Sequence, residues 1–396
     1  MKKKSNVCNP DMKVLHLLSN WKWTERSEPA ADLAIAQSKL GADIRFICGR
    51  SPIPSAEDVA FHANLKGLES VDVLELPKHF QIRSAWRDFR KLRNIVRDFG
   101  PDIIHCHLVN AHLLAYLARG LSPLPLIIRS SYDPEGPATN LKAKFLHRYG
   151  TDGLVVINQK AKDCAVKNLG FASDAIQVAE PGIDLHRFSP NRELTANRKS
   201  FGLAEGSFVV GVVSRIRESR RIDIALAAVK ALADKYPQLQ MLLVGRGREG
   251  AVESVVANPV REMGIANRVI LSGYCRGDRL VAAYRAMDVL IYPIPGTDKS
   301  CRTVREAMAA GTPVIAPRIG FLTELIDDGY NGRFMEFSAE SAAHILSELI
   351  TDADQLDQLK QNALQTSIKR FSRSHHGKKV LSFYKRRMRG EFNIED

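Results

Sequence analysis

The feature that most constrains this fold is a regular alternation of short apolar runs and longer amphipathic segments. Apolar runs begin near residues 13, 44, 71, 102, 125, 153 and 176, and again near 208, 239, 268, 288 and 314. Many are followed by stretches whose apolar residues recur at helical spacing. Strands and helices that alternate at this pace predict parallel sheets covered by helices, an α/β fold.

The chain is long enough for two such sheets, because its 396 residues exceed the usual size of a single domain. A polar, linker-like stretch at 191–205 separates the two series of apolar runs. The run at 208–213 is almost purely apolar, which is typical of a strand buried on both faces. We therefore predict two doubly wound, Rossmann-like domains that meet near residue 190.

Composition narrows the functional classes. No window approaches the ~20 apolar residues of a membrane span, and no signal-peptide core follows the basic first residues. The six cysteines lack Cys-x-x-Cys spacing, which favours a reducing cytoplasm. The net charge of +13 suits nucleic acid, anionic lipid or a phosphorylated substrate. Because no basic stripe is interleaved with aromatic residues, we expect no nucleic-acid partner.

Residues 82–99 predict a helix with one apolar and one strongly basic face. The basic face carries Arg83, Arg87, Arg90, Lys91, Arg93 and Arg97. A solvated charged face is the commoner fate of such a run, and a patch for anionic lipid is the functional alternative. The basic segment 378–389 leaves the same two interpretations open.

The strongest functional pattern lies at 296–324, between two predicted strands. A loop of small and polar residues opens into a predicted helix at 303–310, which ends at Gly311. Free N–H groups make a helix N-terminus an anion site. The carboxylates of Asp298 and Glu306 bracket this turn, and carboxylates accept hydrogen bonds from hydroxyl groups. A phosphate flanked by hydroxyl-rich groups describes a nucleotide sugar.

This stretch resembles the donor-binding signature of family 4 glycosyltransferases, which are retaining enzymes of the GT-B fold. The signature consists of a first Glu, seven intervening residues, a second Glu and then Ala-Met-Ala-x-Gly-x-Pro-Val. Residues 306–314 match the part from the second Glu onward in full, and Asp298 replaces the first Glu. The resemblance implies that Glu306 holds the ribose hydroxyls and that Asp298 reaches the donor sugar. It also implies that the helix N-terminus meets the diphosphate, at Cys301, Arg302, Thr303 and Val304.

A second part of the resemblance follows the buried run at 208–213. In the family, the diphosphate is clamped by the Arg and the Lys of a motif that reads Gly-Arg, four intervening residues and Lys-Gly. Arg215 matches the Arg of this motif. Arg220 replaces the Lys, which keeps the positive charge and adds a guanidinium that can form two hydrogen bonds at once. Gly245 follows the next strand in a Gly-x-Gly, which we assign to the donor site. Such a pair also suggests a dinucleotide-binding dehydrogenase, but no third glycine stands at Rossmann spacing.

In the first domain, His105 and His107 lie where the strand at 102–106 ends. Ligands of open α/β sheets gather at the carboxyl ends of strands, so His107 is a candidate catalytic residue, and a purely structural role fits it equally. Relatives commonly place a histidine where this chain has Ser131. That departure weakens any mechanism based on histidine.

The resemblance implies a GT-B fold with two facing domains and a cleft between them. Residues 1–190 would bind the acceptor, residues 191–374 would bind the donor, and the C-terminal helix at about 375–396 would pack back on the first domain. We expect hexosyl transfer from a nucleotide diphosphate sugar to a cell-surface glycan precursor, of polysaccharide or lipopolysaccharide type, on a lipid carrier. No metal or resident cofactor is expected, and the enzyme would be cytoplasmic or peripheral on the inner face of the membrane. The alternatives are a catalytically inactive sugar-nucleotide-binding protein and a GT-B epimerase or phosphorylase.

Overall fold

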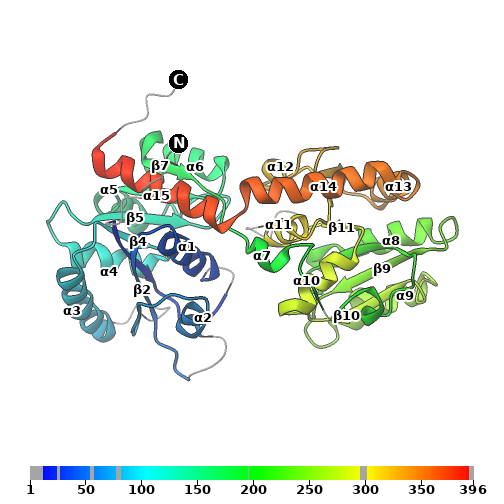
Figure 1. Ribbon diagram of the computed structural model, residues 1–396, viewed down its shortest axis with the longest axis horizontal. Coiled ribbons are helices and arrows are strands. Elements are labelled where there is room, and N and C mark those ends of the chain that lie inside the picture. Colours follow the sequence, from blue (N-terminus) through cyan, green and yellow to red (C-terminus); the bar gives the residue numbers. More distant parts are fainter. Residues whose placement is uncertain are drawn as a thin grey trace, which may run out of the picture. The chain divides into compact units, whose positions relative to one another are not determined.

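The computed structural model describes residues 12–24, 27–53, 58–76, 82–194, 196–294 and 301–391, so the predicted site residue Asp298 lies outside the described residues. The chain divides into two compact units: unit 1 is Met1–Gly182 with Arg373–Asp396, and unit 2 is Ile183–Ser372. Each unit holds one parallel sheet with helices around it (Figure 1). The predicted fold class, two Rossmann-like α/β domains, is therefore confirmed.

The sheet of unit 1 has seven strands in the order β3-β2-β1-β4-β5-β6-β7, all paired in parallel. They are β1 (Lys13–Leu18), β2 (Asp43–Gly49), β3 (Val71–Leu74), β4 (Ile103–Cys106), β5 (Leu126–Ser131), β6 (Gly153–Val156) and β7 (Ile176–Val178). The strand order reverses between β1 and β4, and ligands of open α/β sheets gather at the carboxyl edge of such a switch point. The register of this pair places His16 beside His105.

Helices cover both faces of this sheet. They are α1 (Glu28–Lys39), α2 (Val59–Leu65), α3 (Ile82–Phe99), α4 (Val109–Arg119), α5 (Leu141–Gly150), α6 (Gln159–Leu169) and α15 (Arg373–Arg389). Val14 and Leu18 of β1 share an apolar cluster with α1, α2 and α15, whereas Leu15 and Leu17 share one with α3 and α4. Alternate residues of a strand point to opposite faces, so these clusters are the two halves of the core.

The boundary of the units lies after Gly182, whereas the sequence suggested residue 190. The intervening residues form α7 (Leu185–Phe188), which contacts α10 and α11 of unit 2. Phe188 is buried there, with its ring centroid 6.1 Å from that of Tyr284. This short helix therefore belongs to the core of unit 2.

The sheet of unit 2 has six parallel strands in the order β10-β9-β8-β11-β12-β13. They are β8 (Phe208–Val213), β9 (Leu239–Val244), β10 (Val269–Gly273), β11 (Val289–Ile291), β12 (Val314–Pro317) and β13 (Gly332–Met335). The remaining helices are α8 (Ile222–Leu232), α9 (Asn258–Glu262), α10 (Gly277–Ala286), α11 (Arg302–Ala309), α12 (Leu322–Leu325), α13 (Ala339–Thr351) and α14 (Ala353–Arg370). Here the order reverses between β8 and β11, which makes the carboxyl end of β8 the expected ligand edge.

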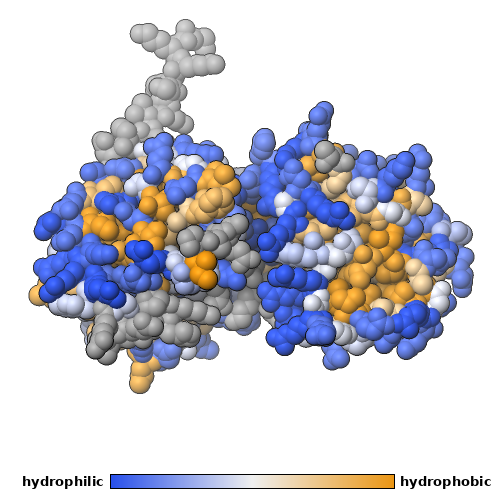
Figure 2. Space-filling view, turned by 90° about the horizontal axis from the view of Figure 1, so that it is seen from below, coloured by the Kyte–Doolittle hydropathy of each residue, from blue (hydrophilic) through white to orange (hydrophobic). Residues whose placement is uncertain are grey.

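The surface alternates between hydrophilic areas and smaller apolar patches, as one face of the molecule shows (Figure 2). Within the described part of the chain, no helix combines the length and the apolar character that crossing a bilayer requires. The cysteines in these residues are free thiols.

Candidate functional site

The loops that follow β8 and β9 run side by side at the expected ligand edge of unit 2. Ile216 pairs with Gly247 as an isolated parallel bridge, and the Ile216 N–H donates to the Arg246 carbonyl at 3.0 Å. A Cβ atom on Gly245 would lie 1.8 Å from the Ser214 carbonyl oxygen, so only glycine permits this approach. The predicted site residue Gly245 therefore permits the close packing of the two loops.

Pairing of these loops brings together basic side chains, which we call the arginine cluster: Arg215, Arg217, Arg220, Arg246 and Arg248. Among the described residues, none of them forms an ion pair with a carboxylate. Other arginines of unit 2 do, including Arg192 with Asp278 at 2.8 Å. The cluster thus concentrates positive charge that the surrounding described residues leave unneutralised.

Two further observations concern unmet interactions of the cluster in the described structure. Nη1 of Arg220 is buried without a hydrogen-bond partner in the described structure. A buried donor left unsatisfied costs about 1–3 kcal/mol, which a bound anion would recover. Desolvation, and then the charges of Arg215, Arg220 and Arg248, lower the pKa of the Arg217 guanidinium. Sequence motifs identified Arg215 and Arg220, but Arg217 and Arg248 become visible only through the pairing of the loops.

The N-terminus of α11 holds the next group of predicted residues. Cys301 precedes the helix with φ at +44°, a left-handed conformation that is uncommon for residues other than glycine. Its side chain makes no capping hydrogen bond, so the backbone N–H groups of the first turn are not capped by this residue. Arg302, Thr303 and Val304 form that turn, as the sequence predicted.

Glu306 lies one turn further along α11 and is buried. Its Oε1 accepts a hydrogen bond from Arg302 Nε at 2.7 Å, and its Oε2 accepts one from the Tyr284 hydroxyl at 3.0 Å. Burial, with the neighbouring Glu306 charge, raises the pKa of the Tyr284 phenol, which therefore stays a donor. Since each carboxylate oxygen has two lone pairs, one on each remains for a ligand hydroxyl.

An exposed aromatic ring lies just beyond the end of β10. The guanidinium of Arg246 lies 4.5 Å from the ring centroid of Tyr274, and that of Arg276 lies 5.0 Å from it. These cation–π contacts hold the ring in place beyond the carboxyl end of β10.

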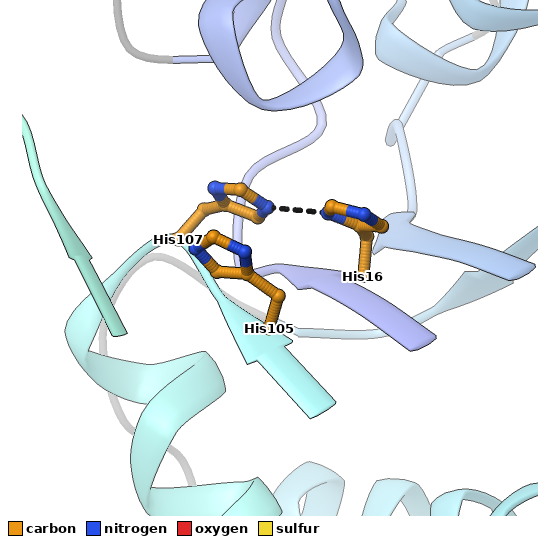
Figure 3. A group of neighbouring side chains, drawn as sticks. All are labelled: His16, His105 and His107. Carbon is orange, nitrogen blue, oxygen red and sulfur yellow. Dashed lines mark hydrogen bonds between the residues drawn. The ribbon is translucent and has the colours of Figure 1, made fainter. Parts of the chain in front are cut away.

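In unit 1, His107 belongs to a buried network with His16 and His105 (Figure 3). His16 Nε2 lies 2.9 Å from Gln37 Oε1, and His16 Nδ1 lies 2.9 Å from His107 Nε2. His107 Nδ1 lies 2.8 Å from the Tyr132 hydroxyl. Because Gln37 Oε1 can only accept, the bonds point one way: Tyr132 donates to His107, which donates to His16, which donates to Gln37.

His105 completes this network. Its Nε2 lies 2.7 Å from Ser130 Oγ, and its Nδ1 bonds to the Tyr384 hydroxyl of α15. Burial lowers the pKa of His16 to about 4 and holds the pKa values of His105 and His107 well below their usual range, so all three rings are neutral at physiological pH.

Ring nitrogens of these histidines lie within 4.8 Å of one another, which is close enough to consider a metal site. However, His105 stacks on His107 with centroids 4.4 Å apart and planes 13° from parallel. Lone pairs of imidazole lie in the ring plane, so stacked rings do not aim at a common point. The structure therefore places His107 in a neutral hydrogen-bond network, and His16, which motif analysis missed, is its central member.

Comparison with protein families gives two matches. Residues 194–366 match the model described as Glycosyl transferases group 1. Residues 30–187 match the model described as Glycosyltransferase Family 4. The first match lies within unit 2, and the second covers most of unit 1 and extends five residues past Gly182 into unit 2.

Curated relatives include D-inositol 3-phosphate glycosyltransferases from several bacteria. The protein of Stackebrandtia nassauensis is 29% identical over 290 residues, which cover 70% of this chain and 62% of the relative. That of Saccharomonospora viridis is 30% identical over 250 residues, which cover 58% of this chain and 57% of the relative. The chain thus matches less than two thirds of the length of these relatives.

Solved structures share the fold at low sequence identity. Anabaena Alr3699/HepE in complex with UDP has a TM-score of 0.76 at 19% identity, covering 94% of this chain and 99% of that one. A glycosyltransferase from Rickettsia africae has a TM-score of 0.78 at 16% identity, covering 96% and 99%. The lipopolysaccharide outer core galactosyltransferase WaaB has a TM-score of 0.65 at 17% identity, covering 96% and 100%.

Proposed function

Because this chain belongs to the family 4 glycosyltransferases of the GT-B fold, we propose that it transfers a hexosyl group from a nucleoside diphosphate sugar to an acceptor hydroxyl. The observation that carries this proposal is the arginine cluster, whose Arg220 Nη1 is buried without a partner in the described structure. Neighbouring structures that contain UDP and UDP-glucose support a donor of this class.

In the proposed reaction, the bond between the anomeric carbon and the diphosphate breaks while the acceptor oxygen bonds to the same face of that carbon, and the proton of the acceptor hydroxyl passes to the departing diphosphate. The departing diphosphate gains charge, and Arg215, Arg220 and the first turn of α11 are placed to stabilise it. Glu306 would accept hydrogen bonds from the ribose hydroxyls, and Asp298 would reach the donor sugar. We propose that these cations, rather than a metal ion or another cofactor, neutralise the leaving group.

For the acceptor we propose a molecule that carries phosphate. A glycan precursor on a lipid carrier is one candidate, and the name of the WaaB neighbour supports it. A phosphorylated polyol is the other, since the relatives are named for inositol 3-phosphate. Transfer of labelled sugar to each acceptor, with the anomeric configuration of the product read by NMR, distinguishes the candidates and tests retention.

A lipid-linked acceptor requires contact with a membrane, and α3 has a suitable face. Arg87, Arg90 and Arg93 are exposed, as is 56% of Trp86, and the Arg90 guanidinium lies 4.9 Å from the centroid of the Trp86 ring. Basic side chains beside an exposed tryptophan favour an anionic bilayer surface. We propose weak, salt-sensitive association with the inner face of the cell membrane.

The experiment that tests the function is a thermal-shift screen against nucleoside diphosphates and their sugars, followed by turnover of the donor that binds. We expect sugar transfer to an acceptor, and slow hydrolysis of the donor in its absence. Binding without turnover or hydrolysis would instead identify a sugar-nucleotide-binding protein. Asp298→Asn should leave affinity for the bare nucleotide intact while it reduces turnover or changes the preferred sugar.

A further inference from the structure

The arginine cluster holds more positive charge than the proposed donor requires. The diphosphate of a nucleotide sugar carries one negative charge on each phosphate. Arg215 and Arg220 are sufficient to match it, which leaves Arg217, Arg246 and Arg248 without an assigned anion. Arg246 lies on the Tyr274 ring, where its charge has an aromatic partner. Arg217 and Arg248 therefore remain to be explained.

These two side chains occupy equivalent places on the paired loops. Arg217 follows Ile216 and Arg248 follows Gly247, and Ile216 and Gly247 are the residues that form the parallel bridge. Arg217 interacts electrostatically with Arg248 and also with Arg215 and Arg220. The pair thus adjoins the proposed diphosphate clamp.

Nothing nearby neutralises the pair in the described structure. Glu218 and Glu249 belong to the same loops, yet neither forms an ion pair with the cluster. Elsewhere in unit 2, exposed arginines do have acidic partners, such as Arg261 with Glu253 and Arg318 with Asp328. Like charges gathered without counter-ions repel one another, and such a gathering suits a site that is completed by an anion.

We propose that Arg217 and Arg248 form a second anion subsite, beside Arg215 and Arg220, that binds a further phosphoryl group. This inference rests on the proposed function, because it takes the neighbouring pair as the diphosphate clamp. A terminal phosphate carries about −1.5 to −2 charges and three acceptor oxygens, which match two guanidinium forks better than a carboxylate does. Both arginines are exposed, so a ligand reaches them from solvent.

The phosphoryl group can come from two sources. It can belong to the same molecule as the diphosphate, as the terminal phosphate of a nucleoside triphosphate does. It can also belong to a second molecule, such as a phosphorylated acceptor or free phosphate. Calorimetric titration of the full chain distinguishes the two sources. The protein is titrated with the nucleoside diphosphate that binds most tightly in the screen and with the corresponding triphosphate. Inorganic phosphate is then titrated into the complex with the diphosphate.

The test compares wild type with the double variant Arg217→Ala/Arg248→Ala. In wild type we expect the triphosphate to bind roughly tenfold tighter than the diphosphate, because one charged hydrogen bond contributes about a factor of ten in affinity. The alternative expected result is that inorganic phosphate binds alongside the diphosphate. The double variant should lose this gain, while its diphosphate affinity falls less than that of Arg215→Ala/Arg220→Ala. Folding is expected to be preserved, because the variant removes exposed, mutually repelling charges.

The matched control is Arg261→Ala/Arg318→Ala, which removes the same charge from paired arginines elsewhere in unit 2 and should retain the gain. A triphosphate gain alone assigns the subsite to one molecule, and phosphate binding beside the diphosphate assigns it to a second molecule. The inference is overturned if wild type shows neither effect, or if the control variant loses the gain equally. If no nucleoside diphosphate binds, the proposed function fails. The subsite is then tested with inorganic phosphate alone: binding that is lost in the double variant Arg217→Ala/Arg248→Ala supports it, and no such binding overturns it.

Discussion

Replacement of Glu306 by glutamine tests how this site holds a nucleotide. In the structure, Oε1 of Glu306 is bonded to Arg302 Nε and Oε2 to the Tyr284 hydroxyl, at 2.7 and 3.0 Å. One lone pair per oxygen remains for the two ribose hydroxyls. Glutamine removes the charge and turns one of these acceptors into an NH₂ donor, while the side chain keeps its shape.

The expected loss follows from those contacts. A hydrogen bond to a charged group contributes about 1.5–3 kcal/mol, so one such bond lost to ribose weakens the nucleoside diphosphate about 10- to 150-fold. The same substitution weakens the contact to Arg302, which should lower the melting temperature by only a few degrees. Binding is measured by calorimetry, at a temperature where both proteins are folded.

A ligand without ribose hydroxyls separates the site from the fold. The 2′,3′-dideoxynucleoside diphosphate should bind wild type and Glu306→Gln within about threefold, because it cannot use the missing acceptor. Glu262→Gln, an exposed acid on α9, is the matched control and should change neither affinity. Equal weakening of the ribose and dideoxyribose ligands by Glu306→Gln would refute the assignment.

Other expected outcomes concern the clamp, the membrane face and the histidine network. Arg215→Ala with Arg220→Ala should weaken a nucleoside diphosphate by about 150-fold or more, at about 1.5–3 kcal/mol for each charged contact, and leave the nucleoside unchanged; equal losses for both ligands in calorimetry would contradict the clamp. Replacing Arg87 and Arg93 by Gln should reduce binding to anionic vesicles about 30-fold at low salt, at about 1 kcal/mol per charge. If the wild-type protein does not float with such vesicles in a flotation assay, the basic face of α3 is a solvated surface. Burial depresses the pKa of His16 from 6.5 to about 4, so the neutral ring stabilises the fold fully above pH 6.5, and this contribution is lost as the pH falls towards 4. Unfolding in urea should therefore begin at a lower urea concentration at pH 5 than at pH 7. Identical urea midpoints at the two pH values would rule out this contribution of His16.

The sequence predicted the elements whose signals are local. On α11, Val304, Ala307 and Met308 recur at helical spacing and are buried, and Gly311 follows the helix with positive φ. The apolar run that became β8 predicted the ligand edge where Arg215 stands. Neighbouring residues alone carry these signals, so no knowledge of the tertiary fold was needed.

Non-local contacts could not be predicted in this way. His16 meets His107 only because β1 and β4 are adjacent, and Arg217 meets Arg248 only because the loops after β8 and β9 pair. Motif analysis considers one segment at a time, so both pairs went unnoticed.

The last helix shows how packing can override intrinsic preference. Sequence reasoning placed this helix at about residues 375–396, and glycine disfavours a helix interior. The structure begins α15 at Arg373 and includes Gly377, where an added Cβ would lie 3.0 Å from Cβ of Ala36. The close approach of α1 therefore requires glycine there, and tertiary contact overrides the intrinsic preference.

The return of α15 to unit 1 determines the order in which the protein can mature on the ribosome. Val380, Phe383 and Tyr384 of this helix are fully buried and complete one face of the first sheet, yet they are synthesised only after the whole of unit 2. Unit 2, Ile183–Ser372, emerges whole in between, which takes about 10–40 s at ~5–20 residues per second. The second unit can thus fold while the first still exposes an unfinished apolar face, and a nascent chain that stops before Arg373 leaves that face uncovered.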